Sequence, residues 1–193
     1  METLRAVTDE EQRTPKPSIK PIVIMMSGLP GTGKTFFSRR LAEKLPLTII
    51  ESDRIRKTLF PKPAYTPAEN TKVFQFVNQR IEELLKDGVS VIFDATNLEE
   101  RHRRSVYRIA EKWGVRLLII KVEAPVGLVR KRLNKRISKP DTMNLSDADW
   151  YVYRRMKSSA EKITLPHFTI NTAGDITPAI EKIIQEINRR KET

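Results

Sequence analysis

The chain has 193 residues, of which 39% are hydrophobic and 31% charged, and this composition predicts one globular domain. It contains no cysteine, which excludes disulfides, thiolate metal sites and cysteine nucleophiles, and no apolar run approaches the roughly 20 residues of a membrane-spanning helix. The formal net charge is +12, and residues 101–139 alone hold thirteen Lys or Arg against two Glu. Basic surfaces attract polyanions, so this segment predicts either a nucleic-acid partner or a solvated basic face.

The N-terminal end of the chain lacks apolar periodicity. Residues 1–20 include Pro15 and Pro17 among several charges, which predicts a flexible arm ahead of one domain over residues 21–193. The same residues lack the apolar stretch and the small-residue cleavage site of a secretory signal. We therefore expect a cytoplasmic protein that makes no contact with membranes.

Apolar strands and amphipathic helices alternate from residue 21 onwards. Continuous apolar runs predict strands at 22–27, 47–51, 89–93, 116–122 and 168–171. Helical periodicity predicts helices at 34–45, 67–86, 98–113, 125–136, 146–162 and 178–190, with a further helix after the second strand. Residues 138–144 contain Pro140 and no periodicity, which predicts a loop. The alternation predicts an α/β fold with a parallel five-stranded sheet, helices on both faces and right-handed crossovers.

A glycine-rich sequence stands between the first strand and the first helix. It matches the phosphate-binding loop pattern in full, with Gly28, Leu29, Pro30, Gly31, Thr32, Gly33, Lys34 and Thr35 in order. The glycines let backbone N–H groups face the phosphates of a nucleotide, and the helix N-terminus adds positive potential. Lys34 is predicted to bridge the phosphates, and Thr35 to bind Mg²⁺ through its hydroxyl. The motif in this context predicts a three-layer sandwich of the P-loop NTPase type that binds ATP and Mg²⁺.

Asp53 comes directly after the second strand. Open parallel sheets place ligands at the carboxyl ends of their strands, so Asp53 is predicted to face the γ-phosphate and to accept the proton of an attacking hydroxyl. Asp is also a favoured N-cap, and in this alternative Asp53 only starts the next helix. Arg56 is predicted to bind an anionic part of the acceptor, or else to be an exposed helix arginine.

The third strand ends in Asp94, which is followed by Ala95, Thr96 and Asn97. An apolar strand closed by an acidic residue has the form of a second nucleotide-binding motif, and Asp94 is predicted to bind Mg²⁺ through water or to orient the acceptor. Thr96 and Asn97 are candidates for substrate contacts. Both are also typical turn residues, and Asn97 is predicted to cap the following helix.

The helix predicted at 125–136 carries five basic residues just before the Pro140 loop. Helical spacing puts Arg132 and Arg136 on a common face, from which both can reach a transferring phosphoryl group, so this helix predicts an arginine-bearing lid. For the other three, Arg130, Lys131 and Lys135, a solvated basic face is favoured. Lys34, Asp53, Arg132 and Arg136 are thus the catalytic candidates.

The combination of these motifs resembles a family of P-loop kinases grouped around the polynucleotide 5′-hydroxyl kinases, which includes O-phosphoseryl-tRNA kinases, zeta toxins and chloramphenicol phosphotransferases. The resemblance covers residues 22–162. It rests on the loop at 28–35, on Asp53-Arg54-Ile55-Arg56, on Asp94-Ala95-Thr96-Asn97 followed by Arg101, and on Arg132 with Arg136. It implies that Asp53 activates the acceptor hydroxyl, that Arg56 engages the acceptor's phosphate and that the lid arginines contact ATP. Arg101 joins the substrate-binding candidates on the same basis.

Three functional hypotheses follow. The leading one is an ATP-dependent kinase that transfers the γ-phosphate to a polynucleotide or nucleotide 5′-hydroxyl, favoured by Arg56 and the basic segment 101–139. The second keeps this chemistry but takes a small metabolite or seryl-tRNA as the hydroxyl-bearing acceptor. The third, of another class, is an ATP-hydrolysing switch that acts on a protein partner. The chain has no clear Asn-Lys-x-Asp segment for reading guanine, so ATP is the expected nucleotide.

Overall fold

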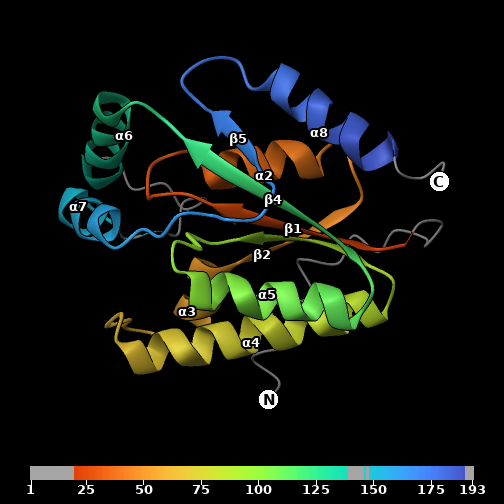
Figure 1. Ribbon diagram of the computed structural model, residues 1–193. Coiled ribbons are helices and arrows are strands. Elements are labelled where there is room, and N and C mark those ends of the chain that lie inside the picture. Colours follow the sequence, from red (N-terminus) through yellow and green to blue (C-terminus); the bar gives the residue numbers. More distant parts are fainter. Residues whose placement is uncertain (1–19, 139–145, 147, 190–193) are drawn as a thin grey trace.

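The computed structural model describes residues 20–138, 146 and 148–189, and its centre is a parallel five-stranded sheet (Figure 1). The strands are β1 (Ile22–Ser27), β2 (Leu47–Glu51), β3 (Ser90–Asp94), β4 (Arg116–Glu123) and β5 (Phe168–Asn171). Their order across the sheet is β2-β3-β1-β4-β5, and every neighbouring pair is parallel. The predicted α/β sandwich is confirmed.

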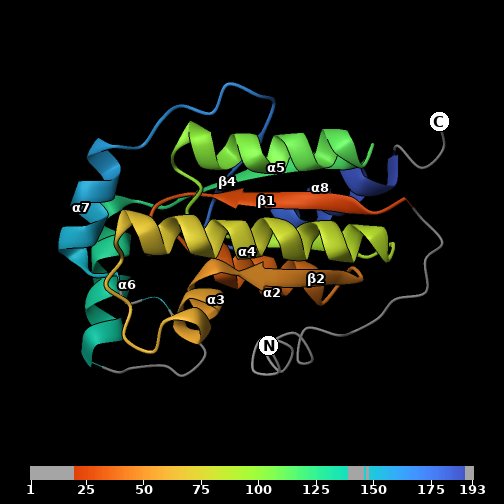
Figure 2. The ribbon, with the colours of Figure 1, turned by 90° about the horizontal axis from the view of Figure 1, so that it is seen from below.

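Helices cover both faces of the sheet and one of its ends. The described helices are α2 (Lys34–Ala42), α3 (Ser52–Leu59), α4 (Pro67–Lys86), α5 (Glu100–Lys112), α6 (Val126–Ser138), α7 (Trp150–Ser158) and α8 (Thr177–Arg189). In Figure 1, α2 and α8 lie on one face, whereas α3, α4 and α5 lie on the other. Figure 2 shows α6 and α7 beyond the end of the sheet to which the strand arrows point. This end holds the carboxyl termini of all parallel strands, where such sheets bind ligands.

The two hydrophobic cores follow from the alternation of side chains along β1. Val23 and Met25 face the core under α4 and α5, whereas Ile24 and Met26 face the core under α2 and α8. All six residues of β1 are buried, as expected for a strand covered on both faces. Each fully buried aliphatic side chain contributes about 1.5–3 kcal/mol relative to an exposed one, so these cores hold the strand ends in place.

A third, smaller cluster attaches α6 and α7 to the phosphate-binding loop. Val129 and Leu133 of α6 pack with Tyr153 of α7, and Leu29 of the loop and Trp150 join them. The end of the sheet is therefore closed by helices that contact the glycine-rich loop directly.

Several element boundaries differ from the sequence-based expectations. The helix predicted at 34–45 ends at Ala42, because Pro46 disfavours a helical residue 45. The helix predicted at 146–162 begins only after Asp149, whose side chain accepts a hydrogen bond from the Val152 amide at 2.8 Å, and ends at Ser158. Beyond Ser158 the backbone bonds instead to the loop after β3: the amide of Glu161 donates to the carbonyl of Leu98 at 3.0 Å.

Two predicted segments fall largely outside the described residues. They are the N-terminal arm at 1–20, except for residue 20, and the loop at 138–144, whose first residue is the last of α6. No helix within the described ranges is long and apolar enough to cross a membrane.

Candidate active site

The phosphate-binding loop begins with Gly28, a position that tolerates no side chain. Gly28 has φ 150°, and a Cβ there would lie 2.4 Å from the carbonyl oxygen of Val122. Its amide donates to the carbonyl of Thr96 at 3.0 Å, which joins the loop to the residues after β3. The close passage of three chain segments at this point explains why a side chain is not tolerated.

The loop ends at Gly33, the N-cap of α2. Gly33 is left-handed, with φ 96°, and supplies no side-chain cap, so the first amides of α2 stay open to an anion. Thr32 closes the loop internally, since its hydroxyl donates to the carbonyl of Leu29 at 2.8 Å. This geometry suits the phosphates of a nucleotide.

Lys34 is almost completely buried, and its Nζ donates to the carbonyl of Leu29 at 3.1 Å. Burial lowers the pKa of Lys34, and the carboxylates of Asp94 and Asp53 oppose this shift. Burial likewise raises the pKa of Asp94 to about 6, while Lys34 and a hydrogen bond from Thr35 act in the opposite direction. An ammonium and two carboxylates thus meet at the start of α2.

Thr35 and Asp94 fit the requirements of Mg²⁺. Both supply oxygen, and their mutual hydrogen bond puts hydroxyl and carboxylate side by side. The described residues contain no group of three or more acidic or histidine side chains that could hold a metal by themselves. A site with one or two protein ligands suits Mg²⁺, which usually keeps waters and substrate phosphates as its other ligands.

A cavity of about 570 Å³ extends from this loop to the opposite side of the sheet end. On one side it is lined by Pro30, Gly31, Gly33, Lys34 and Thr35. On the other, its lining includes Arg56, Tyr65, Asn70, Phe74, Leu98 and His102, and α7 adds Val152, Arg155 and Met156. Asp53, Asp94, Thr96 and Arg136 line it between these two parts. We call the first part the nucleotide side and the second the acceptor side.

Asp53 lies in the first turn of α3, and the N-cap position belongs to Glu51. The alternative that Asp53 only caps this helix is therefore wrong. Its carboxylate interacts electrostatically with Lys34 and with Arg136, which reaches the cavity from α6. Burial lowers the pKa of Arg136, and Asp53 opposes the shift. Positive groups from two elements thus face one carboxylate.

Arg56 is buried, with 6% of its surface exposed, and not the exposed helix arginine of the alternative prediction. Its Nη2 donates to Asn70 Oδ1 at 2.6 Å, and its Nη1 lies 3.7 Å from a carboxylate oxygen of Glu69. The ring of Tyr65 lies 4.8 Å from the guanidinium carbon. Nε and Nη1 are enclosed by the protein and have no hydrogen-bond partner among the described residues, and Arg56 lines the cavity.

Two residues predicted to bind substrate lie outside the cavity lining. Asn97 is fully buried and outside the cavity lining, and it does not cap α5, whose N-cap is Glu99. Its side chain donates to the carbonyl of Met26 at 2.8 Å, which links the loop after β3 to β1. Arg101 is mostly exposed, pairs with Glu99 at 2.6 Å and does not line the cavity. Neither residue lines the cavity, and a substrate contact of either stays a prediction.

Arg132 lies behind the phosphate-binding loop. Its guanidinium donates to the carbonyl and hydroxyl of Thr172 at 2.8 and 2.9 Å and to the carbonyl of Gly31 at 3.3 Å. It does not line the cavity, in contrast to Arg136 one helical turn later. The prediction that both arginines reach the same phosphoryl group does not fit this arrangement, and contact of Arg132 with ATP stays a prediction.

Sequence reasoning missed most of the acceptor side. Phe74 and His102 stack with ring centroids 4.0 Å apart, and Tyr65 has a positive φ of 54°. Tyr65 is held by Glu69, whose carboxylate accepts hydrogen bonds from the amides of Ala64 and Tyr65. The capping pattern Thr66-x-x-Glu69 was legible in the sequence, but nothing in it indicated that the aromatic residue before it lines a site.

A protein family described as AAA domain matches residues 23–163. The chain belongs to this family. It is 29% identical over 179 residues to the L-seryl-tRNA(Sec) kinase of Methanococcus maripaludis, covering 88% of this chain and 67% of that one. It is 30% identical over 125 residues to the "Probable adenylyl-sulfate kinase" of Aeropyrum pernix, covering 62% and 68%.

Solved structures of this AAA domain fold agree with the architecture. The APS kinase of Mycobacterium tuberculosis, in complex with AMPPNP and APS, has a TM-score of 0.69 at 14% identity and covers 90% of this chain and 99% of its own. Chaetomium thermophilum Kti12, in complex with ADP-AlF3, has a TM-score of 0.68 at 17% identity, with 86% and 96% covered. At these identities the likeness concerns the fold.

Family membership and the named relatives identify the chain as a P-loop kinase, a phosphotransferase that uses ATP with Mg²⁺ and an alcohol group as acceptor. The predicted family resemblance is confirmed at this level.

Proposed function

We propose that this kinase phosphorylates a hydroxyl group carried by a nucleotide or by a nucleic acid. The observation that carries the proposal is Arg56 on the acceptor side, a buried guanidinium that lines the cavity and whose Nε and Nη1 have no hydrogen-bond partner among the described residues. A guanidinium in the wall of a cavity suits a phosphate or a similar anion. The two curated relatives support the same class, because one is named for a charged tRNA and the other for an adenylyl compound.

In the proposed mechanism, ATP binds along the nucleotide side, with its phosphates on the amides of 28–35 and its γ-phosphate near Asp53. Thr35 and Asp94 would hold Mg²⁺, which would neutralise charge on the phosphates. Asp53 accepts the proton of the acceptor hydroxyl as that oxygen attacks the γ-phosphorus and ADP leaves, and Arg136, which interacts with Asp53, offers positive charge to the transferring group.

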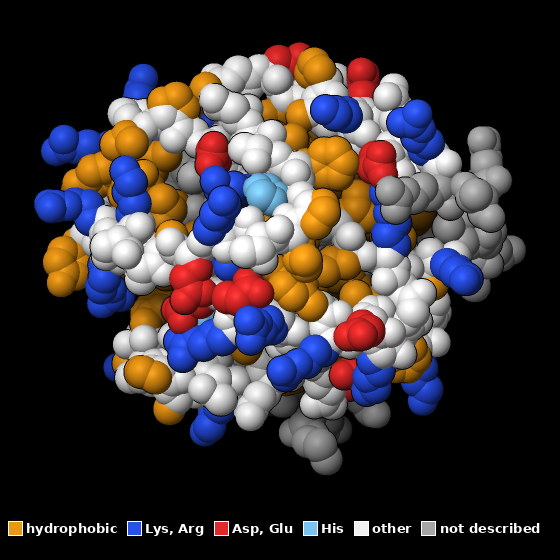
Figure 3. Space-filling model, in the orientation of Figure 1, with side chains coloured by type: hydrophobic (Ala, Val, Ile, Leu, Met, Phe, Trp, Pro, Cys, Tyr) orange, Lys and Arg blue, Asp and Glu red, His pale blue; other side chains and the backbone are white. Residues whose placement is uncertain are grey.

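The basic surface of α6 and α7 supports a polymeric acceptor. Figure 3 shows Lys and Arg side chains over these helices, at the margin beside the acceptor side. Exposed basic residues there are Arg130, Lys131, Lys135, Arg154, Arg155 and Lys157, and Arg155 also lines the cavity. Such a surface favours the sugar-phosphate backbone of a nucleic acid that presents its terminal hydroxyl to Asp53.

The test is transfer of labelled γ-phosphate to a panel of acceptors: 5′-hydroxyl oligonucleotides, seryl-tRNA, mononucleotides with sulfate or phosphate groups, and small alcohols without a nucleotide. We expect transfer to at least one nucleotide-bearing acceptor. For a polymer, transfer should weaken steeply as salt rises from 50 to 200 mM, by about tenfold or more if several phosphates are contacted.

Two results would count against the proposal. Transfer only to a small alcohol would show that the acceptor carries no nucleotide, although the mechanism of phosphoryl transfer would still hold. Hydrolysis of ATP that no acceptor stimulates, and that survives Asp53→Ala, would instead favour the ATP-hydrolysing switch.

A further inference from the structure

Arg103, in the first turn of α5, is the largest of the fully buried side chains in the described part of the chain. Burying a guanidinium is costly unless its donors are used. Here Nε donates to Glu100 Oε2 at 3.0 Å, Nη1 donates to the carbonyls of Asn97 and Leu98 at 3.1 and 2.7 Å, and Nη2 donates to the carbonyl of Lys162 at 3.0 Å. Nη2 also forms an ion pair with Glu100 at 2.9 Å.

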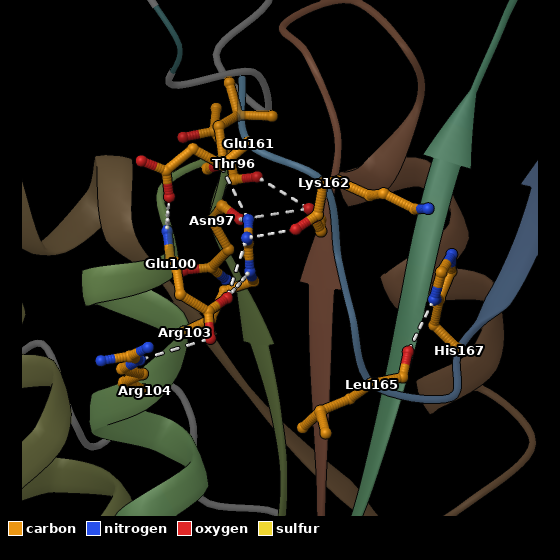
Figure 4. A network of polar contacts seen from close by, with 11 residues as sticks. Thr96, Asn97, Glu100, Arg103, Arg104, Glu161, Lys162, Leu165 and His167 are labelled. Atoms are coloured by element: carbon orange, nitrogen blue, oxygen red, sulfur yellow. Dashed lines mark hydrogen bonds and ion pairs between the residues drawn. The ribbon is translucent and has the colours of Figure 1, made fainter. Parts of the chain in front are cut away.

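The three carbonyls belong to two segments that adjoin the cavity, which Leu98 of the one and Ser159 of the other line. Asn97 and Leu98 are in the loop that follows β3 and carries Thr96, directly after Asp94 at the strand end, whereas Lys162 is in the segment that follows α7. Figure 4 shows the Arg103 side chain between Asn97 and Lys162, with hydrogen bonds to both segments. One side chain therefore bridges segments about 60 residues apart in sequence.

Glu161 reinforces the same junction. Its amide donates to the carbonyl of Leu98 at 3.0 Å, and its carboxylate accepts a hydrogen bond from the amide of Glu100. Glu161 itself is exposed, so this second link contributes little to the core. The segment after α7 is thus tied to the loop after β3 by both side chains and main chain.

The loop after β3 is in turn tied to the nucleotide side. Asn97 donates to the carbonyl of Met26, Ser27 donates to the carbonyl of Asn97 at 3.2 Å, and Gly28 donates to Thr96. A continuous series of hydrogen bonds therefore runs from the start of the phosphate-binding loop through Arg103 to Lys162, in the segment that follows α7. Val152 and Met156 of α7, the helix that precedes this segment, line the acceptor side.

We propose that Arg103 is a positioning residue for phosphoryl transfer, which fixes the α7 wall of the acceptor side relative to the loop that follows Asp94 and bears Thr96. The proposal rests on the kinase function proposed above. Arg103 does not line the cavity, so it acts through the segments that it holds. Because transfer depends on the alignment of acceptor oxygen and phosphate, a displaced wall lowers the rate of transfer while the nucleotide is still bound.

The test compares Arg103→Met, Arg103→Lys and Glu161→Ala with the wild type. Arg103→Met is expected to keep MgATP affinity within about twofold and to lower kcat/KM for the acceptor on the order of a hundredfold. Arg103→Lys, with fewer donors in a different geometry, should lose less. Glu161→Ala, an exposed change that should leave the fold intact, should lose about threefold to tenfold in the same parameter.

Arg116→Met is the matched control. Arg116 also donates to a main-chain carbonyl, that of Glu186, at 2.8 Å and pairs with the carboxylate of the same residue. It lies at the opposite end of the sheet, at the start of β4. Its removal should lower thermal stability without changing acceptor kinetics.

Amide hydrogen exchange provides a readout that needs no acceptor. In Arg103→Met, exchange in residues 159–163 and 95–98 should accelerate by about tenfold or more relative to the rest of the sheet, and in Arg116→Met it should not. The exchange experiment separates the role of Arg103 from the proposed function. A wild type that phosphorylates no nucleotide-bearing acceptor contradicts the proposed function, while the exchange data still test whether Arg103 fixes the two segments.

Unchanged acceptor kinetics in folded Arg103→Met, or equal kinetic losses in Arg116→Met, would overturn the proposal. So would unchanged exchange at residues 159–163. If Arg103→Met does not fold, Arg103→Lys and Glu161→Ala decide, and wild-type acceptor kinetics in both would contradict the positioning role.

Discussion

The nucleotide side and the acceptor side of the cavity are built in different ways. The nucleotide side comes from eight consecutive residues, Gly28 to Thr35, whose geometry is set by local turns and the start of α2. The acceptor side combines side chains from α3, α4, α5 and α7, which only the folded chain brings together. The first half is therefore suited to one constant task, the binding of a triphosphate, and the second can vary with the acceptor.

Asp53 stands between the two sides, and its removal should produce the largest effect. Asp53→Ala is expected to lower kcat by about a thousandfold, because the acceptor hydroxyl loses its base, while MgATP affinity changes by less than about threefold. Rapid-quench transfer assays and a nucleotide titration measure the two quantities separately. A parallel loss of both would mean that Asp53 belongs to the nucleotide side alone.

Lys34→Met should weaken the nucleotide side as a whole. The buried ammonium lies among groups that would face the phosphates, so kcat should fall by a few hundredfold, roughly, and MgATP affinity should fall with it. The exposed Lys44, which follows α2, offers Lys44→Met as a control expected to behave like the wild type. Retention of full activity in Lys34→Met would remove this residue from the catalytic set.

The free energy of unfolding should report the buried Asp94 directly. Its pKa in the folded protein is about 6, above the ordinary 3.8 because burial disfavours the charged form. A raised pKa means that stability is fully present below pH 4 and is lost as pH rises through 6. In metal-free buffer, the stability of the wild type minus that of Asp94→Asn should therefore fall by on the order of 3 kcal/mol between pH 4 and pH 7.

Denaturant unfolding of both proteins in EDTA at several pH values measures this difference. A difference that does not depend on pH would show that Asp94 is not buried as described.

Arg56→Lys should give the smallest change, confined to the acceptor side. A lysine keeps the charge but loses the planar fork, so the acceptor KM should rise about tenfold while the KM for MgATP stays constant. Arg54→Lys, on the same helix but outside the cavity lining, is the control. Steady-state kinetics with each substrate varied in turn would refute the division into two sides if both KM values rose together.

The same contrast explains what the sequence could and could not reveal. The order of strands and helices and the phosphate-binding loop were predictable, because each depends on local pattern: β1, β2, α4 and β5 have the predicted bounds. Asn97 was assigned to a cap by its residue type, yet tertiary hydrogen bonds to Met26 and Ser27 place it in the interior. Hydrogen bonds between residues this far apart in the chain leave no pattern in the sequence.

Long-range partners also explain the remaining errors. Helical spacing put Arg132 and Arg136 on one face, but Thr172, forty residues further on, holds the first behind the phosphate-binding loop. Arg103 looked like one of many basic residues in the segment 101–139, and only its burial distinguishes it from exposed neighbours such as Arg101 and Arg104. A count of charged residues does not distinguish a buried arginine that links two segments from an arginine on the surface.

Isothermal titration calorimetry of the wild type with a non-hydrolysable ATP analogue tests the central claim, that residues 28–35 bind a magnesium nucleotide independently of the acceptor side. One saturable site per chain is expected in magnesium buffer without acceptor, much weaker binding in EDTA, and near wild-type affinity in Asp53→Ala. Absence of binding in magnesium buffer, or binding that appears only when an acceptor is added, would contradict the account.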